Sequence, residues 1–180
     1  MSNIYIYAEQ FDNVVEPSAA ELVTLVREFS KKSGQKITLL AFGEDTSAIA
    51  SQLAFDDVSV TVVKTPVSAF QDDAISVVVA DALEKLKPDS VIIPASRTAR
   101  ALFSRVAVRL GVGLTADCSE LDVDEHGEFI QRKSAFGANA MCVCVEKGGP
   151  KLVTVLVGGI HESAPLSGTV PAVTELEGLE

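Results

Sequence analysis

The sequence predicts an α/β fold with a doubly wound, mostly parallel sheet, helices on both faces and an antiparallel portion toward the C-terminal end. Before Gly113, short apolar runs alternate with longer segments whose apolar residues recur at helical spacing. Strands separated by helices of this length form parallel sheets with right-handed crossovers. After Gly113 the helical spacing gives way to short strands separated by turn residues, which is typical of antiparallel pairs.

Four strands are expected in the parallel part of the sheet. Each is an apolar-rich run too short for a globular helix, which suits a strand that helices cover on both faces. These runs span residues 4–8, 37–42, 58–63 and 91–95.

A helix is expected after each of these strands. Pro17 and the capping-box pair Ser18 and Glu21 open the first helix, and Gly34 ends it. The other helices are expected over residues 46–53, between Pro66 and Pro88, and from a cap at Ser96 or Thr98 to Leu110.

Two hairpins are expected in the last third of the chain. Residues 119–123 and 128–133 flank one turn, and residues 141–146 and 152–157 flank the other. From Gly158 onward Gly, Ser and Pro recur and the periodicity disappears. We therefore expect residues 1–157 to form a single α/β domain and residues 158–180 to form an extended arm or linker.

The composition limits the classes of partner. The chain has 180 residues, of which 47% are hydrophobic and 22% charged, and a formal net charge of -10, so nucleic acid is not expected as a partner. No apolar run of about 18 residues occurs, and no membrane insertion is expected. The odd number of cysteines, Cys118, Cys142 and Cys144, favours neither disulfides nor a metal site and is typical of a reducing cytoplasm.

No catalytic residue is expected. His126 lies in a charged turn and His161 in the Gly-rich arm, where a solvated side chain is the simpler interpretation than a general base. The chain has no Gly-x-Ser-x-Gly elbow, no His-Glu-x-x-His motif and no Walker loop. The pattern indicates no enzyme active site.

A ligand cleft at the strand ends is the main candidate site. In doubly wound sheets, ligands bind beyond the carboxyl ends of the parallel strands, near the point where strand order reverses. The candidate cofactor-binding residues at these ends are Ala8, Glu9, Gly43, Ser96, Thr98 and Arg100, with Asp117 close by. A phosphate or carboxylate could bind the free N–H groups where the fourth helix begins. Because that turn lacks the glycines that let a backbone approach a phosphate, we expect an empty cleft.

The fourth helix carries four of the six arginines of the chain. In an acidic protein such a helix is either an ordinary solvated face or a surface for a partner. Arg105 and Arg109 are the candidates for partner binding.

Five segments carry a resemblance to a known family. Residues 4–10 resemble a strand ending in Ala-Glu-His, and residues 91–111 resemble a strand, turn and arginine helix that occur together. The further similar segments are Thr115–Asp117, Phe136–Ala140 and Lys151–Val155. In this order, they resemble the N-terminal domain of the α subunit of electron transfer flavoproteins.

The resemblance implies an adenine nucleotide alpha hydrolase-like fold. It also implies a scaffold domain of a FAD-containing electron carrier, which links dehydrogenases such as acyl-CoA dehydrogenase to the respiratory chain as a heterodimer with a β subunit. The family's flavin-holding motifs Gly-Gly-Arg-Gly and Gly-Gln-Thr-Gly do not occur here, so FAD is expected mainly on an absent domain and none on this chain alone. The residues leave open a free-standing adenine-nucleotide-binding module like the universal stress proteins, and a hydrolase of adenine nucleotides.

Overall fold

A seven-stranded, wholly parallel sheet forms the centre of the computed structural model, which describes residues 3–68, 71–126, 129–135, 140–144, 148–169 and 173–177. Its strands are β1 (Asn3–Tyr7), β4 (Lys36–Gly43), β5 (Val58–Lys64), β6 (Ser90–Pro94), β7 (Leu114–Cys118), β11 (Lys151–Val155) and β12 (Val173–Glu177). Their spatial order is β12-β5-β4-β1-β6-β11-β7. The predicted α/β fold with a mostly parallel sheet is confirmed.

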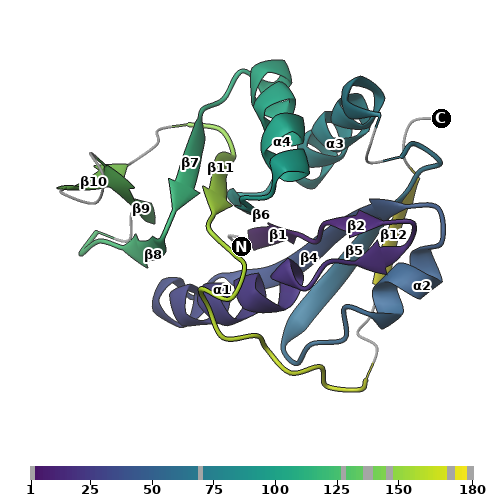
Figure 1. Cartoon of the computed structure of the whole chain (residues 1–180), viewed down its shortest axis with the longest axis horizontal. Helices are drawn as coiled ribbons and strands as arrows, with labels where there is room; N and C mark the ends of the chain where they lie inside the picture. The colour runs from purple at the N-terminus through teal and green to yellow at the C-terminus, as the bar shows by residue number, and fades with distance from the viewer. Residues whose placement is uncertain are drawn as a thin grey trace.

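Helices cover both faces of this sheet, as the prediction of a doubly wound fold requires. The helices are α1 (Ser18–Ser33), α2 (Thr46–Ser51), α3 (Asp72–Leu86) and α4 (Arg97–Leu110). Figure 1 shows α3 and α4 on one side of the sheet and α1 and α2 on the other. The buried residues accordingly fall into two apolar clusters, one on each face.

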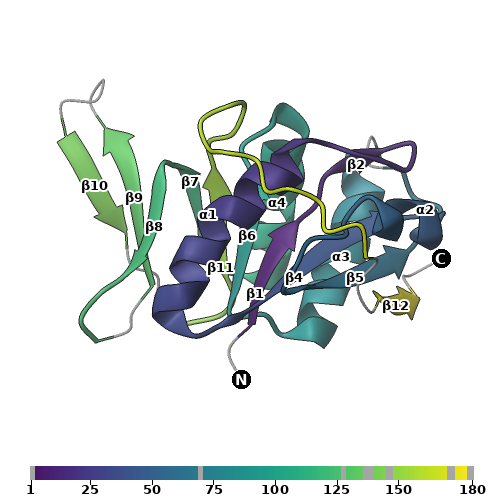
Figure 2. The ribbon, with the colours of Figure 1, turned by 90° about the horizontal axis from the view of Figure 1, so that it is seen from below.

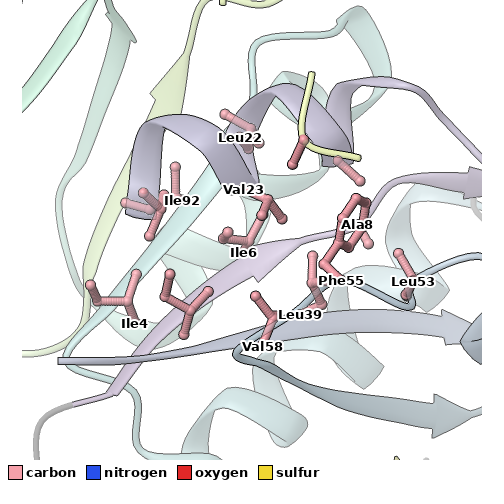
Figure 3. Packing of buried hydrophobic residues seen from close by; sticks show 14 of the residues in the cluster. Ile4, Ile6, Ala8, Leu22, Val23, Leu39, Leu53, Phe55, Val58 and Ile92 are labelled. Atoms are coloured by element: carbon pink, nitrogen blue, oxygen red, sulfur yellow. The ribbon is translucent and has the colours of Figure 1, made fainter. Parts of the chain in front are cut away.

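Fully buried side chains hold the layers together. Figure 3 shows Leu22 and Val23 of α1 lying over Ile6 of β1, and all three are 0% exposed. On the opposite face, the ring of Phe103 in α4 meets Tyr7 edge to face, with centroids 5.0 Å apart. Apolar area removed from water on both faces of β1 stabilises the centre of the fold.

A second, antiparallel sheet stands at one end of the molecule. It contains β8 (Glu120–Val123), β9 (Phe129–Ala135) and β10 (Ala140–Cys144), in the order β10-β9-β8. The predicted pairing of residues 119–123 with 128–133 is confirmed by the register Leu121↔Gln131, although Gly127 and Glu128 of its turn lie outside the described residues. The rings of Phe29 in α1 and Phe129 in β9 are 4.9 Å apart, so this sheet packs on α1.

The second predicted hairpin is wrong. β10 pairs with β9, while β11 enters the central sheet between β6 and β7, parallel to both. The reason is burial: Leu152 and Val153 of β11 point to opposite faces and are both 0% exposed, whereas Met141 and Val143 of β10 are 50% and 57% exposed. A strand that is apolar on both faces belongs in the middle of a parallel sheet.

The N-terminal cap of α1 also differs from the prediction. Pro17 occupies the cap position, and Ser18 is the first residue inside the helix rather than its cap. The carboxylate of Glu21 therefore does not complete a capping box and accepts hydrogen bonds from a distant turn. The predicted end is confirmed, because Gly34 has a left-handed φ of 68°.

Four strands were not expected from the sequence: β2 (Gln10–Phe11), β3 (Val14–Val15), β7 and β12. β2 and β3 form a small hairpin whose turn residues Asp12 and Asn13 have φ of 50° and 64°, as in a type I′ turn. β12 lies within the predicted arm and pairs with the edge of β5. No helix in the part of the chain that the structure describes is long and apolar enough to cross a membrane.

Candidate functional site

The strand order reverses at the carboxyl ends of β1 and β6, the place hereafter called the crevice. From β1 the chain runs outward through β4 to β5, and then returns to β6 on the other side of β1. The helices that follow β1 and β6 pack on opposite faces of the sheet (Figure 2). This arrangement places Glu9, just after β1, beside Ser96, just after β6. Ligands of doubly wound sheets bind in such a crevice.

A carboxylate of the protein itself lies at the start of α4. The Oγ of Ser96 donates a hydrogen bond to Oε1 of Glu9 at 2.8 Å and accepts one from the N–H of Ala99 at 2.9 Å. Ser96 is thus the cap of α4, while Thr98 lies half-buried in its first turn. Glu9 is only 3% exposed. Burial raises the pKa of Glu9, and the hydrogen bond from Ser96 offsets part of that rise.

Arg100 is brought close to Asp117, as the sequence suggested. Its Nε lies 2.9 Å and its second terminal nitrogen 2.8 Å from Oδ1 of Asp117. Asp117 has a φ of 59°, at the place where the register between β7 and β11 shifts, and its N–H donates to Oγ1 of Thr154 at 2.8 Å. The charge of Arg100 is therefore matched within the protein.

Gly43 and Ala8 are separate from the Glu9–Ser96 contact. Ala8 is fully buried, and its N–H donates to the carbonyl of Leu40. Gly43 ends β4 beneath the β2–β3 hairpin, where Gln10 donates to the carbonyl of Phe42 at 2.6 Å. A Cβ added at Gly43 would overlap Cδ1 at the end of the Ile49 side chain, so that buried side chain would have to shift. Gly43 lines a hollow of about 120 Å³ together with the hairpin and residues 65–68.

The two arginines predicted to bind a partner make contacts inside the protein. Arg105 Nε lies 3.1 Å from Oδ1 of Asp73, and Arg109 Nε donates to Oγ of Ser76 at 2.9 Å. Both acceptors belong to α3, so the arginines help to join α4 to α3. The side chain of Arg105 is still 42% exposed.

Sequence reasoning missed a hollow of about 520 Å³ between α1, α2 and the segment after β11. Because the residues that line it are far apart in the chain, no local sequence pattern could predict it. Its apolar lining comes from Val15, Pro17, Ala20, Phe55, Ala164 and Leu166. Among the described residues that line it, none is a lysine or an arginine, and Glu16 is the one carboxylate. His161 nearby is not the solvated residue expected, because its Nε2 is buried without a hydrogen-bond partner in the described residues.

Carboxylates at both places disfavour the pyrophosphate of a dinucleotide such as FAD. A pyrophosphate binds free N–H groups or cations, whereas the N–H of Ala99 at the start of α4 donates to Ser96, which contacts the buried carboxylate of Glu9. At the larger hollow, Glu16 would repel it. Within the described ranges, no group of three or more His, Cys, Asp or Glu side chains could hold a metal ion.

Comparison with known proteins identifies the family. The profile of the electron transfer flavoprotein domain matches residues 4–177. The electron transfer flavoprotein subunit alpha of Clostridium acetobutylicum is 30% identical over 169 residues, which are 91% of this chain and 50% of that protein. The equivalent subunit of Thermoanaerobacterium thermosaccharolyticum is 31% identical over 87% of this chain and 48% of its own length.

A third relative has a different name. Subunit LctC of the lactate dehydrogenase (NAD(+),ferredoxin) of Acetobacterium woodii is 31% identical over 84% of this chain and 37% of its own length. The chain thus spans about half, or less, of the length of these relatives. Because the domain profile matches nearly every residue, the chain belongs to the electron transfer flavoprotein family.

Proposed function

We propose that this chain is the scaffold domain of an electron carrier related to the electron transfer flavoprotein α subunit. The carrier would pass electrons from dehydrogenases, such as acyl-CoA dehydrogenase, toward the respiratory chain, in the cytoplasm and without itself being a catalyst. The match of residues 4–177 to the family's domain carries this proposal. The α-subunit names of several relatives support it, whereas a free-standing adenine-nucleotide-binding module is not favoured.

The proposal places FAD mainly on a domain outside these 180 residues. A tightly held flavin needs a deep, mostly apolar pocket with a few well-placed polar groups. The crevice at β1 and β6 instead contains Glu9, and the described lining of the hollow beside α1 includes no lysine or arginine. The role left to this chain is to support the flavin domain and to contact a β subunit in a heterodimer.

Reconstitution tests whether another domain holds the FAD while this chain supports it and contacts a β subunit. The chain is purified alone, with a β-like subunit, and with both the β-like subunit and a family flavin domain, and bound FAD is measured by visible absorbance. We expect flavin only when the flavin domain is present, and reduction of that flavin by a dehydrogenase. Stoichiometric FAD on this chain alone would contradict the proposed place of the cofactor, and failure to bind any β-like subunit would contradict the heterodimer.

The partner role of Arg105 and Arg109 stays a prediction and needs a matched control. Changing both to Glu should weaken binding of the β-like subunit if these side chains face it. Because the same change breaks the contacts with α3, Asp73→Ala is the control: it removes the intramolecular partner of Arg105 and keeps the arginine. Equal weakening by both changes would show that helix packing, rather than the arginine charges, is responsible.

A further inference from the structure

The turn that follows β11 surrounds one buried carboxylate. Glu21, in the first turn of α1, is 6% exposed. Its Oε1 accepts hydrogen bonds from the N–H groups of Gly158 at 3.1 Å and Gly159 at 2.9 Å, and its Oε2 accepts from His161 at 3.4 Å. Successive N–H groups that converge in this way form a concave anion site.

The backbone of this turn is shaped for the contact. Gly158 and Gly159 have φ of 108° and 85°, which side-chain-bearing residues rarely adopt. These angles direct neighbouring N–H groups toward one point. Without an acceptor there, these partly buried donors would lose the hydrogen bonds that water gives the unfolded chain. The hydrogen bonds therefore hold the turn and the side chain in one arrangement. Burial raises the pKa of Glu21, but the hydrogen bonds from the turn together outweigh burial, so the pKa lies below its ordinary value.

The segment beyond the turn follows a defined path over the domain. The N–H of Ala164 donates to the carbonyl of Ala20 at 3.0 Å, and the N–H of Ser167 donates to the carbonyl of Ala54 at 2.7 Å. The segment then reaches β12, which pairs with β5. Figures 1 and 2 show it running from the end of β11, past α1, toward the opposite edge of the sheet.

We propose that Glu21 is a latch that fixes the direction in which the chain leaves β11. Its carboxylate holds the 158–161 turn against α1, so that residues 164–167 meet the carbonyls of α1 and of the loop after α2, and β12 meets β5. An acidic residue in a first helical turn ordinarily faces solvent and interacts with the helix dipole. Glu21 differs because it is buried and accepts from three N–H groups. This proposal is independent of the proposed function.

Glu21→Gln is the discriminating change. The amide keeps the shape of the side chain but replaces one acceptor oxygen with an NH₂ group, which faces N–H donors and cannot bind them. The matched control is Glu28→Gln, an exposed position on the same helix. Both variants of the full chain are compared with the wild type by hydrogen exchange of the backbone amides and by cleavage with a Glu-specific protease after the exposed Glu162.

In Glu21→Gln, the amides of Gly158, Gly159 and His161 should exchange roughly tenfold faster, and cleavage after Glu162 should accelerate by a similar factor. Glu28→Gln should stay within about twofold of the wild type. Rates unchanged in Glu21→Gln, or raised equally in β1 and β4, would overturn the latch. If Glu21→Gln does not fold, Gly158→Ala decides: its Cβ meets nothing within 4 Å, but its φ is strained, and unchanged exchange in this turn would overturn the proposal.

Discussion

Ser96→Ala removes two hydrogen bonds at the crevice, and the loss of each should lower the free energy of unfolding. Loss of the cap bond to the N–H of Ala99 should cost about 1 kcal/mol of unfolding free energy. Loss of the hydroxyl that donates to the carboxyl group of Glu9 should cost about 1.5 kcal/mol more, because it leaves a buried acceptor without its partner. The expected total is about 2.5 kcal/mol at neutral pH.

A double-mutant cycle measured by urea unfolding, followed by circular dichroism, separates the two terms. In a Glu9→Ala background only the cap remains to be lost, so Ser96→Ala should cost about 1 kcal/mol there. Ser104→Ala is the control: this exposed serine on the same helix bonds only the carbonyl of Arg100 in the described contacts, and its loss should cost less than about 0.5 kcal/mol. An equal cost of Ser96→Ala in both backgrounds would refute a stabilising Glu9–Ser96 bond.

Three further changes test the crevice and the core. The pKa of Glu9 is raised in the folded state. Just above the ordinary pKa of Glu, the folded chain therefore still holds a proton that the unfolded chain has lost. The contribution of Glu9 to the free energy of unfolding falls as the pH rises from the ordinary pKa to the raised one. As the pH rises from acid to neutral, the free energy of unfolding of Glu9→Gln, measured in urea, should therefore increase relative to that of the wild type. A difference between the two proteins that does not change with pH would contradict the raised pKa. Phe103→Ala should lower the free energy of unfolding by about 3 to 5 kcal/mol, since the ring is fully buried against Tyr7; a loss below about 1 kcal/mol would show that the core relaxes around it. Thr154→Val leaves the N–H of Asp117 without its acceptor and should cost about 1 to 3 kcal/mol in thermal unfolding, whereas Thr154→Ser should restore most of it.

Local signals were sufficient for the elements around β6 and α4. The run Val91–Ala95 is short and apolar, and Ser96 stands immediately before a segment of helical spacing. Both signals depend on residues a few positions apart, and the structure has β6 and the Ser96 cap where they indicate. Gly34 marks the end of α1 for the same reason, since only the local backbone decides a left-handed cap.

Strand partners were harder to predict, because pairing is a long-range choice. The sequence around Gly148 and Gly149 resembles a hairpin turn, yet β11 pairs with β6 and β7, which precede it by tens of residues. β12 gave no usable signal, since Thr174 and Glu175 are exposed and the strand has one neighbour at the sheet edge. The hydrophobic pattern of a strand predicts which of its faces are buried, but it does not predict which strand pairs with it.

For the crevice, the sequence named the residues but not their relation. Glu9 and Ser96 were both candidates to face a ligand, and the structure shows that they bind each other across 87 positions of chain. A carboxylate and a hydroxyl are as suited to a ligand as to one another. Only the three-dimensional arrangement, which leaves Glu9 3% exposed, distinguishes the two interpretations.

The parallel pairing of β12 with β5 bears on how the protein folds during its synthesis. Residues 58–64 are synthesised more than a hundred positions before their neighbour at residues 173–177. Until that late segment emerges, nascent β5 presents an unsatisfied row of backbone donors and acceptors, which is the kind of surface that recruits chaperones or stray strands. A chain that ends before residue 173 should therefore fold the centre of its sheet but aggregate through the exposed edge of β5.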